Sequence, residues 1–445
     1  MNGPAPALQR SAATNPDALL SRELGVRQLA ANVFNYTVGS GIFVLPAFAV
    51  AQLGSAAPLA YVTCAIVIGL VVLCFAEAGS RVSATGGPYA YVETALGPMV
   101  GFVAGCLVLS TGTSAAAAVA TVLARSILAL FPGLPGWATP LLIVTLVATL
   151  VAINIRGVRT GARVIEAATI AKLLPLLAFV IIGAFFIVPA NLAWTDVPTA
   201  SMVLSTSGIV IFAFSGIEGS LVPSGEVKNP SRTVPLAVFL ALGAATALYL
   251  AIQFVALGIQ GLELAKETTT PLANAAGAAV GPIGRTVLIV GAVISMFGYL
   301  SANVLSEPRG LFAFSRDGFL PRVLATVHPK FHTPNTAIKL YGLIVGAIAL
   351  SGTFEQLAVF ANLAALMLYF LCAIAAWTLR RRNVRTDGAP FEAPGGSLVP
   401  VAACISIAWV FYETVQPKQF VALVIVLAVI FALYGVRAWR TKQPL

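Results

Sequence analysis

The chain has 445 residues, of which 59% are hydrophobic and only 9% charged, with a mean hydropathy of +0.94 and a formal net charge of +10. A soluble domain carries roughly 25% charged residues, so these values exclude a soluble enzyme and indicate a protein embedded in a lipid bilayer. Contact with anionic lipid and membrane topology account for the positive charge, so no nucleic-acid partner is needed.

Twelve apolar stretches follow one another along the chain, each long enough to cross the roughly 30 Å core of a bilayer as a helix. The breaks between them are short, rich in Pro, Gly or charged residues, and too small for a soluble domain. The sequence therefore predicts an all-α integral membrane protein with transmembrane helices over 28–52, 57–79, 99–130, 137–155, 164–189, 200–222, 234–259, 284–308, 337–353, 356–379, 397–415 and 419–438.

The two ends of the chain predict its orientation. Residues 1–26 have no apolar run of their own, which favours a retained cytoplasmic tail over a cleaved signal peptide. With both termini inside, 21 of the 26 lysines and arginines fall on the cytoplasmic side. We therefore expect a multi-pass protein of the cell membrane with cytoplasmic tails at 1–26 and 439–445.

The first predicted helix is interrupted by small residues, with two glycines around a serine in Gly39-Ser40-Gly41. Each glycine weakens a helix by about 1 kcal/mol. Backbone groups freed in lipid are tolerated only where they face protein or a polar cavity. Close helix packing through small residues is the alternative reading of this segment taken alone.

The sixth helix carries a matching interruption, because Ser40-Gly41-Ile42 recurs as Ser215-Gly216-Ile217. Breaks five helices apart predict two repeats, over 27–190 and 200–380, followed by two further helices over 397–438. An odd number of helices per repeat forces the repeats to be inverted. Interrupted helices at matching positions of two halves point to a transporter binding site near the bilayer midplane.

Two such breaks suit a zwitterionic ligand. One half-helix presents unpaired N–H groups and a positive dipole to a carboxylate, while another presents unpaired carbonyls to an ammonium group. An α-amino acid satisfies both ends at once.

The fifth predicted helix contains Lys172. It lies nine residues from Arg163 at the inner end, which at 1.5 Å per residue is about 13 Å deep and near the midplane. Snorkelling to the interface is hard from there. Because burial disfavours the charged form of an amine, Lys172 can alternate between charged and neutral states as access alternates. A fixed structural cation is the alternative.

Glu218 is a second ionisable group within a predicted span. An unpaired charge at that depth costs on the order of 2.5–3.5 kcal/mol or more. We interpret Glu218 as an inner gate or proton-responsive group, with a hydrogen-bonded hub between helices as the alternative.

Catalytic and metal-binding signals are weak throughout. All five cysteines lie within predicted spans without CxxC spacing, and the two histidines, His328 and His332, share a loop without a nearby cysteine or acidic pair. Neither a Walker loop nor a Ser-His-Asp set is present. The sequence predicts no metal, no cofactor, no enzymatic activity and no ATP-driven transport.

Five motifs in order give the chain a family resemblance. They are Gly39-Ser40-Gly41-Ile42-Phe43 with Leu45-Pro46, Gly86-Gly87-Pro88-Tyr89-Ala90-Tyr91 with Leu96-Gly97-Pro98, Phe212-Ala213-Phe214-Ser215-Gly216-Ile217-Glu218, Glu226-Val227-Lys228-Asn229-Pro230-Ser231-Arg232-Thr233-Val234-Pro235, and Ser315-Arg316-Asp317-Gly318-Phe319-Leu320-Pro321. On these residues the chain resembles the amino acid–polyamine–organocation (APC) superfamily over about residues 25–440.

The resemblance implies a LeuT-like fold in which helices 1 and 6 unwind around the substrate and helices 3 and 8 complete the pocket. It places the substrate carboxylate at N–H groups around Ser40, Gly41 and Ile42, and the amine at carbonyls of Phe212, Ala213 and Ser215. The implied substrate-binding set is Gly39, Ser40, Gly41, Ile42, Phe212, Ala213, Phe214, Ser215, Gly216 and Asn303, and the implied coupling and gating set is Lys172, Phe212 and Glu218.

Two of these residues have specific implied roles. Phe212 occupies the place of an aromatic lid over the substrate, with a packing or lipid-facing aromatic as the alternative. Lys172 resembles a lysine that stands where sodium-coupled relatives bind Na⁺, with its ammonium touching the helix 1 break. In an exchanger it would instead be a fixed cation tying helix 5 to helix 1.

The sequence says less about the side chain of the substrate. Helix 3 is mostly small residues without an acid, and helix 8 offers Asn303, which favours a neutral amino acid, although small lining residues also leave room for a large one. We therefore expect a secondary transporter that moves amino acids by alternating access, coupled to protons through Lys172. The alternatives are a sodium-independent exchanger or a polyamine or cationic amino acid carrier. The sequence does not determine the oligomeric state.

Overall fold

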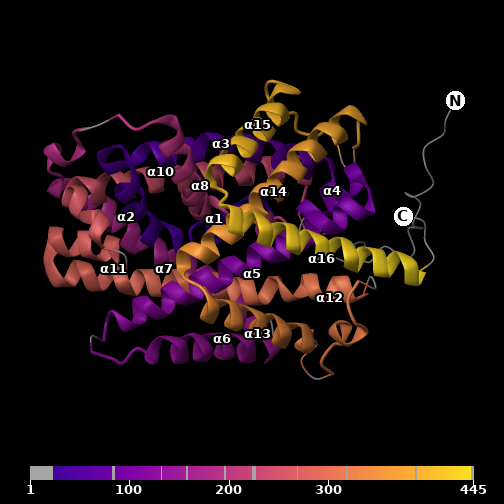
Figure 1. Cartoon of the computed structure of the whole chain (residues 1–445), viewed down its shortest axis with the longest axis horizontal. Helices are drawn as coiled ribbons and strands as arrows, with labels where there is room; N and C mark the ends of the chain where they lie inside the picture. Colours follow the sequence, from indigo (N-terminus) through magenta and orange to yellow (C-terminus); the bar gives the residue numbers. More distant parts are fainter. Residues whose placement is uncertain are drawn as a thin grey trace.

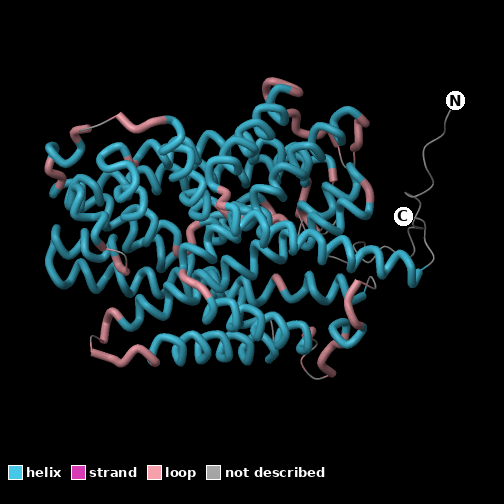
Figure 2. Tube along the Cα trace, viewed as in Figure 1, coloured by secondary structure: helices cyan, strands magenta, loops and turns pink. Residues whose placement is uncertain are grey.

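The computed structural model describes residues 24–82, 86–131, 133–156, 159–194, 197–222, 227–267, 269–316, 319–329, 331, 333–385 and 388–441, without the side chains of 159–170, 313, 316 and 437–441. Most of both predicted tails lies outside these residues, as do His332, Glu226, Asp317 and Gly318. The described part is helical, with short loops between the helices (Figure 2). Its only β pairing is an isolated bridge between Leu24 and Val227.

Proline opens many of the helices, for example α3, α5 and α10, because the first helical position has no use for the N–H that proline lacks. The α-helices are α1 (Val26–Thr37), α2 (Gly41–Leu53), α3 (Pro58–Arg81), α4 (Pro88–Leu96), α5 (Pro98–Leu128), α6 (Ala138–Arg156), α7 (Arg159–Gly183), α8 (Ala200–Phe214), α9 (Ile217–Ser220), α10 (Pro230–Gln260), α11 (Pro271–Ser306), α12 (Pro308–Arg316), α13 (Asn335–Ser351), α14 (Phe354–Arg381), α15 (Leu398–Thr414) and α16 (Pro417–Thr441). Short 3-10 helices are η4 (Gly54–Ala56), η5 (Ala184–Phe186), η6 (Pro189–Leu192), η8 (Gly261–Lys266) and η9 (Arg322–Ala325).

Eight helical stretches in the described ranges are long and apolar enough to cross a membrane, or nine if α1 and α2, bent by 47°, form one span. Three predicted spans correspond to shorter apolar helices over Ala171–Phe186, Asn335–Ser351 and Leu398–Thr414. The predicted all-α class is confirmed, and the number of spans stays a prediction.

The largest shift in a helix boundary concerns α11. The predicted span begins at 284, whereas the helix begins at Pro271 and bends at Val280 and Gly281, where the backbone is not helical. Gly281 adopts a φ of +76°, and Pro282 follows it. The prediction began after this bend because a glycine followed by proline is typical of a helix end.

The interior is built around α5, whose most apolar window is 83% buried. This helix contacts α4, α6, α11, α13 and α14. Its buried face consists mostly of Gly, Ala, Ser and Val, which allow neighbouring helices to approach closely. By contrast α16 lies at the surface (Figure 1), with only 17% of its window buried.

A buried ion cluster joins the end of α3 to the end of α14. The Glu77 carboxylate, 1% exposed, accepts two hydrogen bonds of 2.6 Å from the guanidinium of Arg380 and others of 3.1 and 3.2 Å from Arg81. The backbone N–H of Ala393 also donates to Glu77. One carboxylate therefore holds two cations and a loop at this end of the bundle.

We expect Glu77→Gln to lower the free energy of unfolding by about 3–5 kcal/mol, because it removes the counter-ion of Arg380 and leaves the buried Arg81 with only the exposed Glu392, 3.5 Å away, among the described residues. Thermal unfolding in detergent measures the loss. The control is Glu263→Gln, which breaks a pair with Lys266 whose side chains are 70% and 74% exposed. An exposed pair contributes about 0–1 kcal/mol, so equal losses in the two variants would contradict a structural role for Glu77.

Candidate functional site

The first break separates α1 from α2 at residues 38–40. Side chains from three other helices hold its carbonyl groups. Lys172 of α7 and Ser295 of α11 both donate to the Val38 carbonyl, at 2.9 and 3.3 Å. Tyr249 of α10 donates to the Thr37 carbonyl at 2.9 Å. The break is therefore a fixed part of the interior, stabilised from outside its own helix.

The second break separates α8 from α9 at Ser215 and Gly216. Gly216 has a φ of +112°, a conformation that glycine adopts without the strain a side chain would bring. The Ser215 hydroxyl donates to the Phe212 carbonyl at 2.9 Å, and the Gly216 N–H donates to Glu218 at 3.1 Å. The two copies of Ser-Gly-Ile thus differ in structure, because Gly41 already belongs to α2 whereas Gly216 precedes α9.

The two breaks lie against each other. A Cβ atom at Gly41 would lie 2.8 Å from the Ala213 Cα, and one at Gly216 would lie 2.7 Å from the Tyr36 carbonyl oxygen. Tyr249 bridges them, since its hydroxyl is 2.9 Å from the Thr37 carbonyl and 2.8 Å from the Ala213 carbonyl. A hydroxyl has one proton to donate, so the two carbonyls share it.

The ends of the half-helices offer complementary groups at this contact. The first N–H groups of α2, at Gly41 and Ile42, have no acceptor within their own helix. The Ser40 hydroxyl beside them is buried and has no hydrogen-bond partner. Across the contact, the carbonyls of Phe212 and Ala213 each accept one hydrogen bond and keep a second lone pair. N–H donors and carbonyl acceptors therefore converge between α2 and α8.

Lys172 is completely buried and reaches α1 from α7. Its Nζ donates to the Asn35 carbonyl at 2.9 Å, to the Asn35 side-chain oxygen at 2.6 Å and to the Val38 carbonyl at 2.9 Å. An ammonium group has three N–H donors and all three have acceptors, whereas a neutral amine would leave one acceptor without a donor. The geometry fits the charged form, and loss of a proton would release one contact to the first break.

A small cavity lies beside the two breaks, with a volume of about 10 Å³, about the space that one water molecule needs. Its polar lining comes from α1, α5, α11 and the segment after α8. The lining residues are Tyr36, Val108, Thr111, Gly112, Ala115, Ser215, Gly216, Glu218, Gly219, Tyr299, Asn303 and Glu307. Any larger ligand enters only when these elements move apart.

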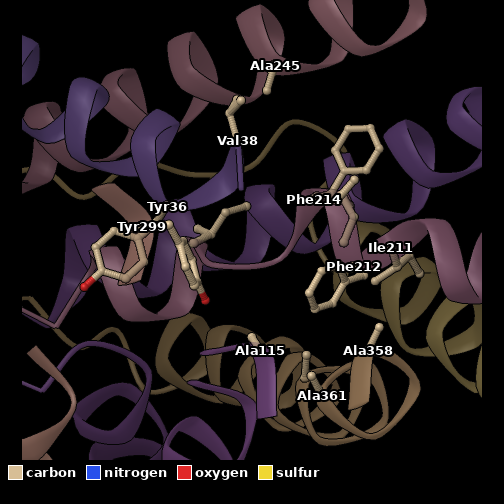
Figure 3. Close-up of a cluster of buried hydrophobic side chains, with 14 of the residues drawn as sticks. Tyr36, Val38, Ala115, Ile211, Phe212, Phe214, Ala245, Tyr299, Ala358 and Ala361 are labelled. Atoms are coloured by element: carbon tan, nitrogen blue, oxygen red, sulfur yellow. The ribbon is translucent and has the colours of Figure 1, made fainter. Parts of the chain in front are cut away.

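The structure brings most of the predicted residues to the breaks, but they divide into two groups. Ser215, Gly216, Glu218 and Asn303 line the cavity, whereas 39–42, Phe212, Ala213, Phe214 and Lys172 do not. Phe212 packs edge-on against Phe354 of α14, with ring centroids 5.5 Å apart (Figure 3 shows Phe212). The Asn303 amide donates to the Gly112 carbonyl and accepts from Tyr341, so it also ties α11 to α5 and α13.

Glu218 is 3% exposed and accepts hydrogen bonds from the Gly216 N–H and from the Tyr369 hydroxyl of α14, the latter at 2.8 Å. It therefore links the second break to a neighbouring helix, as in the hub reading of the sequence. Glu218 also faces the cavity, as a gate or proton-responsive group would. Both interpretations of Glu218 therefore stay predictions.

Sequence reasoning missed two residues of this site. Tyr249 carries no sequence signal, because a tyrosine in an apolar helix is an ordinary core residue. Glu307 could have been found from the sequence, because it is a carboxyl near the inner end of the predicted span 284–308. The prediction of a neutral substrate rested on the acid-free helix 3 and on Asn303 in helix 8, and it did not weigh Glu307. It stays a prediction. Within the described ranges no group of three or more His, Cys, Asp or Glu residues is placed to hold a metal ion.

Comparison with known proteins decides the family. The profile of the amino acid permeases matches residues 24–438. The chain belongs to the amino acid permease family. This confirms the resemblance found in its motifs, and it makes the chain a multi-pass membrane transporter of small molecules and not an enzyme.

Curated relatives of this permease align over most of their length. The methylthioribose transporter of Bacillus subtilis is 28% identical, with 96% of each chain covered. The branched-chain amino acid permease BcaP of the same species is 25% identical over 97% of each chain. The serine/threonine exchanger SteT, also from Bacillus subtilis, is 28% identical over 86% of this permease and 89% of its own length.

Proposed function

We propose that this permease is a secondary transporter that carries amino acids across the cell membrane by alternating access, with both termini cytoplasmic. The observation that carries the proposal is the contact of the two helix breaks at Gly41 and Ala213. There the N–H groups that open α2 would receive the substrate carboxylate. The carbonyls that end α8, with that of Ser215, would receive its amine. The carbonyl of Phe212 belongs to this set, and its side chain would close over the bound substrate.

The proposed architecture has twelve spans, with 27–190 and 200–380 as inverted repeats and 397–438 outside them. Paired packing supports it. In such a repeat each span of the first half corresponds to the span five places later, so α3 corresponds to α10 and α1 to α8. The packing of α3 on α8 is then equivalent to that of α10 on α1, and both contacts are present. Likewise α5 packs on α14 as α11 packs on α7. A five-helix repeat accounts for this pattern, and the odd number of helices in each repeat makes the two copies inverted.

We propose that transport is coupled to protons through Lys172. Three neutral oxygens hold its charged form against the first break, so a proton lost from Lys172 loosens that break. By the family resemblance, Lys172 stands where sodium-coupled relatives bind Na⁺, so its ammonium would exclude that ion and Na⁺ symport is disfavoured.

A sodium-independent exchanger is the second candidate. The observation in its favour is that all three ammonium donors of Lys172 are satisfied, as expected of a permanent strut between α7 and α1. In that case transport would need substrate on both sides of the membrane.

Saturable uptake of labelled amino acids into proteoliposomes tests the function, with all twenty amino acids screened at two pH values. Uptake that saturates and responds to a proton gradient supports the symporter, and uptake only with amino acid inside supports the exchanger. Non-saturating flux would refute a carrier.

We expect amino-acid methyl esters and decarboxylated amines to compete at least roughly tenfold more weakly than the parent amino acid, since each leaves one set of half-helix groups unpaired at about 1–3 kcal/mol. Inhibition of labelled uptake measures this. The matched pair of ester and amine keeps the same side chain, so the comparison isolates the α-groups. An amine that competed as well as its parent amino acid would favour a polyamine carrier instead.

A further inference from the structure

Two glutamates from distant parts of the chain face the same cavity. Glu218 follows the second break and is 3% exposed, whereas Glu307 follows the last turn of α11 and is 7% exposed. A Cβ atom at Gly219 would lie 3.7 Å from the Glu307 carboxyl, which places that carboxyl next to the segment that carries Glu218. The two carboxyl groups also interact electrostatically.

Among the residues that the structure describes, neither glutamate has a cationic partner within ion-pair distance. In the described part of the chain Glu218 and Glu307 form no ion pair, and Glu307 makes no side-chain hydrogen bond. Arg309 is nearby, but it is exposed and its guanidinium donates to the Leu305 carbonyl. An unpaired carboxyl inside a membrane protein is costly and marks a functional site.

The rest of the cavity suits an organic cation. Tyr36 and Tyr299 lie side by side in an edge-to-face pair with ring centroids 6.1 Å apart (Figure 3), and aromatic rings attract ammonium and guanidinium groups. The Thr111 hydroxyl is 2% exposed, lines the cavity and has no hydrogen-bond partner. This unused polar group on a third helix is independent evidence that something polar binds here.

The wall on α5 is made of small residues. Val108, Gly112 and Ala115 contribute to the lining, and Figure 3 shows Ala115 near Tyr36. A Cβ atom at Gly112 would lie 2.5 Å from the carboxyl carbon of Glu307, so only glycine leaves the carboxyl where it is. The site is therefore built around the position of Glu307.

We infer that Glu307 and Glu218, with Tyr36, Tyr299 and Thr111, form a subsite for the cationic end of a substrate side chain, such as an ammonium or guanidinium group. The inference rests on the proposed amino acid carrier and names its substrate class as basic amino acids. The α-groups bind between α2 and α8, and the side-chain cation displaces protons or water from the carboxyl pair when the cavity opens.

Binding to the purified permease tests this inference with lysine against norleucine, and arginine against citrulline, by isothermal calorimetry. Arginine and citrulline have side chains of the same length, and norleucine is lysine without its ammonium group. The α-groups are the same in each pair, and only one member carries a side-chain charge. We expect the basic member of at least one pair to bind roughly tenfold or more tightly. Glu307→Gln should reduce that preference to roughly threefold or less.

A second variant keeps both charges. Gly112→Ala should displace the Glu307 carboxyl and reduce the preference as well. Gly346→Ala, where a Cβ atom would meet nothing within 4 Å, and Glu263→Gln on the surface should leave it unchanged. Melting temperatures confirm that each variant is folded.

Two results would overturn the inference. If norleucine and citrulline bound as tightly as lysine and arginine, there would be no cation subsite, although the amino acid carrier would stand. A changed proton dependence of uptake in Glu307→Gln would then indicate that the two glutamates bind protons instead. A basic preference that survives both Glu307→Gln and Gly112→Ala would place the subsite elsewhere. Failure of every amino acid to bind or enter would instead refute the proposed function.

Discussion

Replacing Lys172 with alanine should abolish the dependence of uptake on a proton gradient and lower the uptake rate at least roughly tenfold. The change removes the donor from three buried oxygens, two on Asn35 and one on Val38, and each unpaired buried acceptor costs about 1–3 kcal/mol. The first break would lose its link to α7. Uptake into proteoliposomes with and without an inward proton gradient measures both effects.

Lys172→Arg separates charge from proton release. Arginine keeps a positive charge but does not readily give up its proton, and its planar fork does not match three acceptors placed for a compact ammonium group. We expect it to be impaired in gradient-driven uptake. Replacing Na⁺ with K⁺ should leave wild-type uptake unchanged.

The outcomes for Lys172 distinguish the two transport modes. Gradient-driven accumulation retained by Lys172→Ala would refute the proton role. One-for-one exchange preserved in that variant, with no accumulation by the wild type, would favour the exchanger and leave Lys172 as a strut between α7 and α1.

Gly41→Val and Gly216→Val should each weaken substrate binding by roughly ten- to a hundredfold, because overpacking or a strained backbone costs about 1–3 kcal/mol. The Cβ atom at Gly41 meets the backbone of Ala213, which cannot rotate away as a side chain can. At Gly216 the strain comes from a φ of +112° and from the Tyr36 carbonyl. Calorimetric titration of the substrate found in the uptake screen measures the loss.

Gly69→Val is the control for both glycine variants, since a Cβ atom there would meet nothing within 4 Å. It tests whether a β-branched residue in a membrane helix is itself harmful. Size-exclusion profiles should show that all three variants are folded. Unchanged affinity in either Gly41→Val or Gly216→Val would remove the contact between the breaks from the binding site.

The sequence by itself determined the fold class and the places where helices break. Composition decides the class because a bilayer admits only backbone that satisfies its own hydrogen bonds, and long apolar stretches then become helices. The breaks could be predicted because a glycine within such a stretch weakens the helix locally, whatever surrounds it. Lys172 and Glu218 could be picked out for a similar reason, since a charged residue in an apolar stretch stands out without knowledge of its neighbours in space.

Only the tertiary structure decided what each of these residues touches. The approach of Gly41 to Ala213 and the Tyr249 hydroxyl between two carbonyls join segments that are far apart in the chain, and no local pattern encodes such distances. Glu307 shows this most clearly. From the sequence it resembles a solvated carboxyl at the end of a span. In the folded chain it is buried beside Glu218, and no counter-ion from the described residues pairs with it. The cost of an unpaired charge depends on its surroundings, which only the folded chain provides.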